Sequence, residues 1–155
     1  MPPPEICLEL VNLYFDYIHD SIHSLFHRPS LIRDLETGKV PSVILFAIIA
    51  LSARFSSNPY FSNTVPRERG NEFAKESNRL LDLRDISMMT LQASVLLGVF
   101  ATGCGEAASE SVYYCVACRI ANLLDLVNRP YADAIEREIN VRGRLRACNK
   151  LIYIL

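Results

Sequence analysis

Three histidines are the residues whose spacing best suits metal chemistry. His19, His23 and His27 follow one another at intervals of four, so on a helix all three would lie on one face. The segment from His19 to His23 has the spacing of a zinc-protease helix, in which two histidines bind the metal and an intervening Glu is the general base. Here the intervening acid is Asp20, which is one methylene shorter, and no convincing third ligand follows. We therefore predict no metal site and interpret these histidines as polar-face or turn residues, with His27 helping to cap the bend that follows it.

A second candidate is the Cys-x-x-Cys pair formed by Cys115 and Cys118. The pair lies in the middle of a predicted helix and has no second pair, whereas a structural zinc site needs four ligands and a redox pair usually begins a helix. We expect both thiols to be small buried apolar side chains. The five cysteines are an odd number without framework spacing, and no secretory signal precedes them, so reduced thiols are expected.

The other polar residues suggest no catalytic set. Arg142, Arg144, Arg146 and Lys150 form a short basic stretch without interleaved aromatic residues, which indicates a solvated helix face rather than a nucleic-acid patch. No Ser/His/Asp or Cys/His combination has the spacing of an activated nucleophile. We predict that the chain is not an enzyme, that it has no catalytic or metal-binding residues, and that it needs no cofactor of its own. The sequence identifies no cofactor-binding residue.

Composition narrows the class of protein. The length of 155 residues is typical of one domain, and with 50% hydrophobic residues the chain can bury a sizeable core. Lys+Arg 16 against Asp+Glu 17 gives a net charge of −1, which argues against a self-sufficient nucleic-acid binder. The sequence contains no secretory signal and no apolar run long enough to span a membrane. We expect a soluble intracellular protein.

One apolar segment, at about residues 41–55, dominates the sequence. From Val43 to Leu51 no residue is polar, so a helix here would have no face to offer water and its neighbours must surround it. A buried strand is the alternative, but the length and the spacing of Ala47, Ala50 and Ala53 favour a helix that other helices approach closely. The predicted fold is all-α, a multi-helix bundle around a central buried helix.

Further helices are expected around this centre. Periodicity and turn signals place them at about residues 5–26, 31–35, 67–83, 88–102, 106–127 and 133–144, with an exposed loop at 56–66. Gly38 is expected to cap the helix before the central one, and Ser87 the helix that starts at 88. The side chains expected to face inward from the helices at 67–83 and 106–127 are Phe73, Ser77, Leu80, Leu81, Val112, Tyr113, Val116, Ile120, Leu123 and Leu124. The helix at 88–102 is nearly as apolar as the central one and carries Met89, Leu91, Val95, Leu96, Val99 and Phe100.

Several short motifs occur in the order found in one known family. Leu13-Tyr14-Phe15-Asp16-Tyr17-Ile18-His19 precedes Leu25-Phe26-His27-Arg28-Pro29-Ser30-Leu31, so an aromatic helix runs into a His-Arg-Pro turn. Leu51-Ser52-Ala53-Arg54-Phe55-Ser56 is similar to an alanine-rich helix ending in Ala-Arg-Phe. Thr90-Leu91-Gln92-Ala93 and Arg119-Ile120-Ala121 match two later helices. Over residues 10–140 the chain resembles the fungal-specific transcription factor domain, the middle regulatory region of fungal zinc-cluster activators.

The sequence departs from that family near its end. After Glu136 and Glu138 the family has an Arg-Arg-Arg run followed by Trp-Trp, whereas this chain contains no Trp. We therefore interpret residues 5–141 as a partial regulatory domain and residues 142–155 as the divergent C-terminal tail of a truncated or misassembled gene product. The last five residues, Leu151-Ile152-Tyr153-Ile154-Leu155, are apolar; they either dock on the bundle or belong to a longer protein.

The resemblance implies a function that the residues alone do not. It implies a nuclear transcription factor whose DNA contact and zinc belong to a separate cysteine-dense module, which this sequence does not contain. It also implies homodimerisation or protein partners through the full-length protein, and regulation by a small-molecule effector. The alternative hypothesis is a helical protein-interaction scaffold that has no part in transcription.

Overall fold

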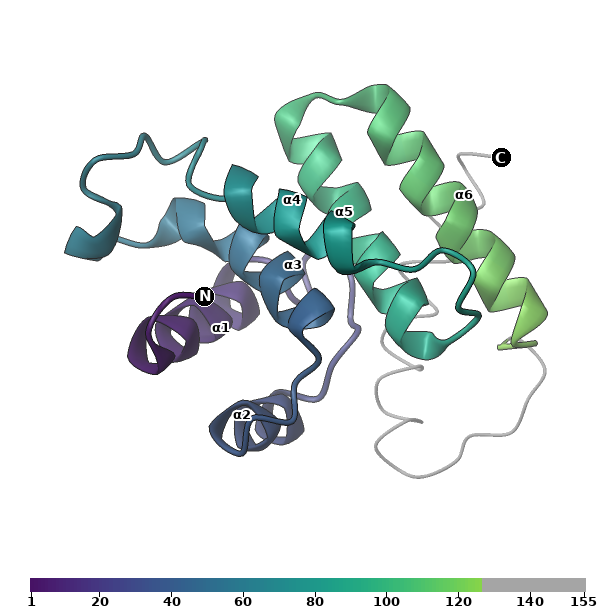
Figure 1. Ribbon diagram of the computed structural model, residues 1–155, viewed down its shortest axis with the longest axis horizontal. Coiled ribbons are helices and arrows are strands. Elements are labelled where there is room, and N and C mark those ends of the chain that lie inside the picture. Colours follow the sequence, from purple (N-terminus) through teal and green to yellow (C-terminus); the bar gives the residue numbers. More distant parts are fainter. Residues whose placement is uncertain (127–155) are drawn as a thin grey trace.

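The protein is all-α in its described part. A computed structural model describes residues 1–126, which contain six α-helices and no β-strand (Figure 1). The helices are α1 (Pro4–Tyr17), α2 (Arg28–Glu36), α3 (Ser42–Ser52), α4 (Asn71–Leu80), α5 (Met88–Cys104) and α6 (Ala107–Leu123), with 3-10 turns η1 (Ala53–Phe55) and η2 (Pro59–Phe61). The fold class predicted from the sequence is therefore confirmed.

Helix α3 is the centre of the structure, as its apolar sequence predicts. Every residue from Val43 to Ser52 is buried. Helices α1, α4 and α5 pack around it, so neighbours cover all of its faces (Figure 1). Pro41 lies one position before the helix rather than at its first residue. The Ser52 hydroxyl donates a hydrogen bond of 2.9 Å to the Ile48 carbonyl, so this buried hydroxyl has a partner inside the core.

Helix α1 is shorter than the helix predicted at 5–26, because it ends at Tyr17. Asp20 has a backbone φ of +61°, a left-handed conformation that no α-helix contains, so the chain reverses there. Ile22 and Leu25 nevertheless pack against the core from this irregular connector, which explains why their spacing imitates a longer helix. Helix α2 then begins at Arg28 and packs on α1.

The predicted cap at Gly38 is confirmed. Gly38 has φ +67° and its amide donates to the Leu35 carbonyl, while the Lys39 amide donates to the Asp34 carbonyl. These two hydrogen bonds form a Schellman motif, in which glycine relieves the steric cost of the left-handed conformation. The turn ends α2 and directs the chain into α3.

The segment between α3 and α4 is better packed than the exposed loop predicted at 56–66. Ser56 and Phe61 are buried, and the Phe61 ring meets the Phe73 ring edge-on at 6.4 Å. Helix α4 is confined to Asn71–Leu80, shorter than the predicted 67–83, because the residues before Gly70 form turns. Leu80, expected to face inward, is exposed, whereas Ser77 is buried as predicted and donates to the Val43 carbonyl at 2.8 Å.

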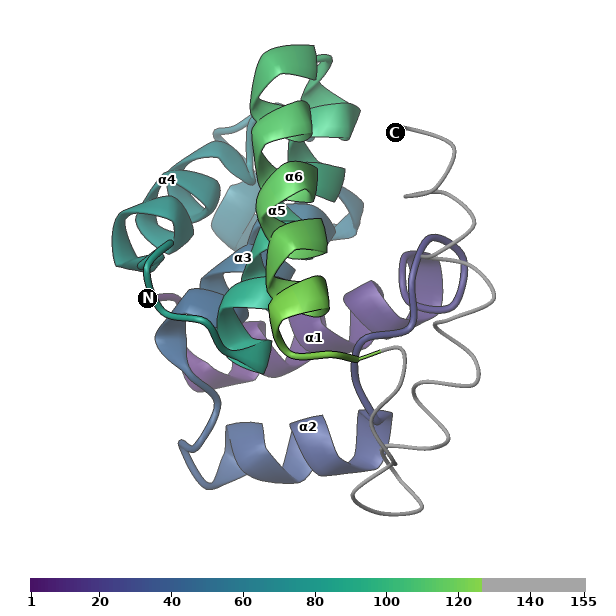
Figure 2. The same cartoon turned by 90° about the vertical axis from the view of Figure 1, so that its right-hand side faces the viewer.

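Helices α5 and α6 lie side by side as an antiparallel pair, which both views show (Figures 1 and 2). The predicted Ser87 cap is confirmed, since its hydroxyl accepts the Thr90 amide. The predicted helix at 106–127 ends at Leu123. It packs chiefly on α5 rather than on α3, so Ala117 and Ile120 are buried but Val112 is 56% and Leu123 46% exposed. The inward orientation predicted for Val112 and Leu123 is therefore wrong.

Some predictions fall on other residues. The helix at 133–144, the divergent tail at 142–155 and the apolar end Leu151–Leu155 lie outside the described part of the chain. Within residues 1–126, no helix is both long and apolar enough to cross a bilayer.

Candidate functional site

The three histidines do not share a helical face; they lie in and at the end of a turn segment, which is one of the two placements predicted for them. His19 and His23 lie in the connector between α1 and α2, where the left-handed Asp20 folds the chain back and brings the two residues into a short parallel bridge. Their ring centroids are 6.4 Å apart. His27 stands at the start of α2, where its Nδ1 lies 2.9 Å from the Ser30 hydroxyl. His19 and His23 therefore lie close together in the connector, and His27 lies at the His-Arg-Pro bend.

His23 is buried in a polar and aromatic cluster. Its Nδ1 lies 3.4 Å from the Tyr14 hydroxyl, and its Nε2 has no hydrogen-bond partner among the described residues. Burial, together with the neighbouring His19, lowers the pKa of His23 to about 4. Burial also raises the pKa of the Tyr14 hydroxyl, and the Asp20 carboxylate raises it further. Both groups are therefore neutral at physiological pH.

His19 and Asp20 stabilise the shape of this connector. The His19 Nε2 accepts the Phe26 amide at 3.3 Å, and the His19 Nδ1 lies 3.4 Å from the Asp20 carboxylate. Asp20 also accepts the Ser24 hydroxyl at 2.5 Å. In residues 1–126, no three His, Cys, Asp or Glu side chains are grouped closely enough to hold a metal ion.

The Cys-x-x-Cys pair lies in the middle of α6, as predicted, but its environment differs from the prediction. Cys115 is exposed and Cys118 is half-buried, because α5 covers only one side of α6. Cys7, in contrast, lies in the core beside α3, and burial raises the pKa of its thiol. A periodic apolar pattern could not reveal which cysteines face solvent, since that depends on how many helices cover each element.

A polar network joins α1 to the segment that follows α3. The Glu9 carboxylate accepts the Ser56 hydroxyl at 2.5 Å and the Asn58 side-chain amide at 2.8 Å. The Arg69 guanidinium donates to the Ser56 carbonyl at 2.6 Å. Asn58 also accepts the Tyr60 amide, which starts η2. Sequence reasoning missed this network; the Asn58-Pro59 turn signal located the turn but not its partner 49 residues away.

A second junction fixes α2 on α1. The Arg28 guanidinium donates to the Asp16 carboxylate and to the Asn12 side-chain oxygen, both at 2.8 Å. The same group lies over the Phe15 ring, 5.4 Å from its centroid, which is a cation–π geometry. The His-Arg-Pro motif is therefore a structural joint between the first two helices.

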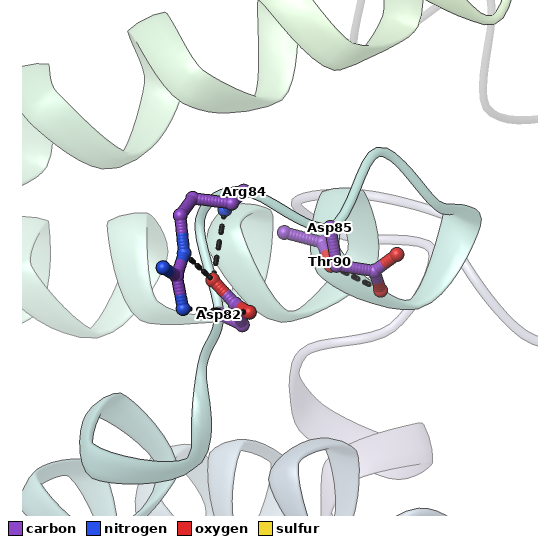
Figure 3. Close-up of polar contacts among 4 residues, drawn as sticks. All are labelled: Asp82, Arg84, Asp85 and Thr90. Atoms are coloured by element: carbon purple, nitrogen blue, oxygen red, sulfur yellow. Dashed lines mark hydrogen bonds and ion pairs between the residues drawn. The ribbon is translucent and has the colours of Figure 1, made fainter.

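The connector between α4 and α5 pairs its charges internally. The Asp82 carboxylate accepts the Arg84 backbone amide at 3.0 Å and its guanidinium at 3.1 Å, while Asp85 accepts the Thr90 hydroxyl at 3.1 Å (Figure 3). The apolar side chains around these pairs remain exposed. They are Leu80, Leu83, Ile86 and Met89.

The described residues form a small all-helical domain whose main feature is the buried core around α3. The sequence model described as the fungal specific transcription factor domain matches residues 11–149 of this chain. The chain therefore belongs to that family of transcription factors, which confirms the resemblance seen in the sequence motifs.

Relatives of known name agree with this assignment. A transcriptional regulatory protein of Schizosaccharomyces pombe, itself termed uncharacterized, is 33% identical over 160 residues, covering 92% of this chain and 16% of that protein. The Zn(2)-C6 fungal-type transcription factor FTF1a of Fusarium oxysporum f. sp. lycopersici is 35% identical over 85 residues, covering 54% of this chain and 8% of that protein. The Zn(2)-C6 fungal-type transcription factor FTF1c of the same fungus is 29% identical over 140 residues, covering 88% of this chain and 15% of that protein. No solved structure matches.

The names of the Fusarium relatives mention zinc, and within residues 1–126 the cysteines of this chain are spread over α1, α5 and α6. A zinc cluster requires thiolates that converge on the metal. Here Cys7 lies on the buried side of α1, Cys104 ends α5, and Cys115 is on the exposed side of α6. The chain spans 16% or less of the length of these three relatives.

Proposed function

We propose that this chain is the regulatory part of a nuclear transcription factor that contacts DNA through a separate zinc-cluster module. The observation that supports the proposal is the match of the family over residues 11–149, together with relatives named as transcriptional regulators. The balanced charge also agrees, because a self-sufficient DNA-binding domain normally has an excess of basic residues. In this proposal the chain catalyses no reaction and binds no metal.

Regulation would act through the packing of the helices. A domain of this kind changes its output when a ligand or partner binds one of two packings more tightly than the other. The α5–α6 pair suits such a change, since α6 is covered on one side only. The exposed apolar side chains beside the α4–α5 connector offer a contact for a protein partner or for a second copy of the chain. A small-molecule effector remains the other candidate, with no residues assigned to it.

The experiment is a tethered reporter assay in a fungal cell. Residues 1–155 are fused to a heterologous DNA-binding module, and transcription from a promoter carrying its site is compared with that of the module alone. We expect the fusion to raise or lower transcription reproducibly and to accumulate in the nucleus when a fluorescent tag replaces the module. Transcription equal to that of the module alone, with the fusion present at normal level, would refute the proposal and favour the scaffold hypothesis.

A matched pair of variants makes the assay specific. Ile48→Asp places a charge in the core and should abolish the effect, since Ile48 is fully buried. Val112→Asp places the same charge on the exposed side of α6 and should leave the fold intact. An effect on transcription that survives Ile48→Asp would mean that the folded domain does not cause it.

A further inference from the structure

The connector between α1 and α2, residues 18–27, buries an ionisable group without the partners that its charged form needs. His23 is 2% exposed, and Ile18 and Ser24 beside it are also buried. The Tyr14 hydroxyl can bond the Nδ1 of His23 at 3.4 Å, but the Nε2 has no partner in the described structure. An imidazolium has two N–H donors, so protonation would leave a buried positive charge with one donor unsatisfied.

The groups that face His23 do little to stabilise such a charge. From α1 there is the neutral Tyr14 hydroxyl, and from the connector itself there is His19, which repels a second positive charge. A backbone hydrogen bond of His23 and the Asp20 carboxylate favour the charged form, but burial outweighs them and lowers the pKa. The Asp20 carboxylate is engaged by the Ser24 hydroxyl and lies beside the His19 ring. Helix α3 has no ionisable side chain, and the α5 residue that reaches the connector is the neutral Gln92, which donates to the Leu25 carbonyl.

The connector is held by separate turn and side-chain hydrogen bonds rather than by a continuous helical ladder. The Asp20 amide donates to the His23 carbonyl at 2.8 Å, the Ile22 amide donates to the Ile18 carbonyl at 3.1 Å, and the Phe26 amide donates to the His19 ring. The surrounding helices, in contrast, have continuous backbone hydrogen bonds and share the core around α3. Irregular segments outside the regular helices generally open at lower free energy than the core.

We propose that residues 18–27 are an acid-sensitive latch, which opens when His23 is protonated and exposes the imidazolium to water. Opening releases the connector from the core while α3 and the α5–α6 pair remain folded. The ligand that opens the latch is a proton, so the latch makes the domain responsive to pH. Its regulatory meaning depends on the proposed function, but the opening reaction does not.

The sign of the effect follows from the pKa difference. The folded state holds His23 with a pKa near 4, whereas the opened state has the ordinary value of 6.5, so the opened state binds more protons. The latch is therefore closed most firmly above about pH 6.5 and loses stability as the pH falls toward 4. Between about pH 7.5 and about pH 5.5 these two values predict that the opening equilibrium constant rises about tenfold.

The test is amide hydrogen exchange followed by NMR on residues 1–155, with protection factors corrected for the intrinsic pH dependence of exchange. The Asp20 and Ile22 amides report on the latch, and the Ile48 and Ile49 amides report on the core. We expect protection of the latch amides to fall about tenfold between about pH 7.5 and about pH 5.5 while the core amides keep theirs. Unchanged latch protection, or an equal fall in the core, would overturn the proposal.

Two variants identify the proton-binding group. His23→Gln should abolish the pH dependence of latch protection, whereas His19→Gln should retain it, because burial of His23 is the larger cause of its lowered pKa. A fall that persists in His23→Gln would overturn the proposal. If His23→Gln does not fold, the ring resonances of His23 in the wild-type protein decide: titration near pH 4 supports the latch, and titration at or above pH 6.5 refutes it. These measurements use purified protein, so their failure is distinct from failure of the reporter assay.

Discussion

Gly70 should tolerate no side chain, because α4 begins where the chain touches the C-terminal part of α3. A Cβ atom at this position would lie 2.1 Å from the Ala50 carbonyl oxygen and 2.7 Å from the Phe100 Cε2 atom. The first neighbour is backbone of the central helix and cannot rotate away. The start of α4 would therefore have to move away from α3, which separates two packed layers of the core.

The size of the Gly70→Ala effect can be estimated from opposing contributions. Gly70 has ordinary right-handed dihedral angles (φ −84°, ψ −18°), so alanine reduces the entropy of the unfolded chain and would stabilise by about 0.4–1 kcal/mol if there were room. Overpacking of a core costs about 1–3 kcal/mol, and a clash with backbone belongs at the upper end of that range. We expect a net loss of about 2 kcal/mol, which lowers the melting temperature by about 4–8 °C in a chain of this size.

Thermal unfolding followed by circular dichroism measures this loss. Gly38→Ala is the matched control: its Cβ would meet nothing within 4 Å, and only the left-handed φ of +67° opposes it, at about 1 kcal/mol. Gly70→Ala should be the more harmful of the two. If Gly70→Ala is as stable as the wild type, the close approach of α4 to α3 is wrong.

Three further outcomes follow from other contacts. Glu9→Ala removes the acceptor of the Ser56 and Asn58 hydrogen bonds and should cost about 1–3 kcal/mol in chemical denaturation, more than Glu5→Ala on the exposed start of α1. Ser87→Ala removes the cap of α5 and should cost about 1 kcal/mol in the same assay, with Ser87→Thr nearly neutral. Cys115 should react with a thiol reagent in the folded protein much faster than Cys7, whose thiol is buried with a raised pKa; equal rates in mass-spectrometric labelling would contradict the placement of α6.

The elements that the sequence predicted well are those with a local physical cause. The uninterrupted apolar run of α3 demanded burial on all sides, and all residues from Val43 to Ser52 are buried. Ser87 and Gly38 act through hydrogen bonds to residues a few positions away, so their roles can be inferred from the sequence. The family motifs were equally local, and the family match confirms them.

The errors arise where tertiary contacts decide. The apolar spacing of α1 continues past Tyr17, but the left-handed Asp20 breaks the helix, and this conformation has no clear signature in a non-glycine residue. Apolar residues on α6 suggested burial at Val112, yet the sequence does not reveal that one neighbouring helix covers α6. The Glu9 network joins residues almost fifty positions apart, a pairing that no local pattern encodes.

For the candidate site, the sequence predicts no catalytic or metal-binding residue, and the histidines are turn or polar-face residues. The structure brings His19 and His23 together through a bridge and a reversed chain, not through the helical spacing that first drew attention to them. Sequence reasoning could find the residues but not their burial. The burial of the unpartnered His23 Nε2 depends on how Tyr14 and the connector pack around the ring, which no local sequence pattern encodes.

The most direct test of the whole account is the thermal unfolding of Ile44→Asp, because the domain is organised around α3. Ile44 is 2% exposed, and an aspartate there would bury an unpaired charge at a cost of several kcal/mol, comparable with the entire stability of a typical domain of about 5–15 kcal/mol. Val112→Asp, on the exposed face of α6, should keep a cooperative transition close to that of the wild type. We predict that Ile44→Asp shows no cooperative transition. A soluble Ile44→Asp variant that unfolds cooperatively near the wild-type temperature would contradict the central role of α3.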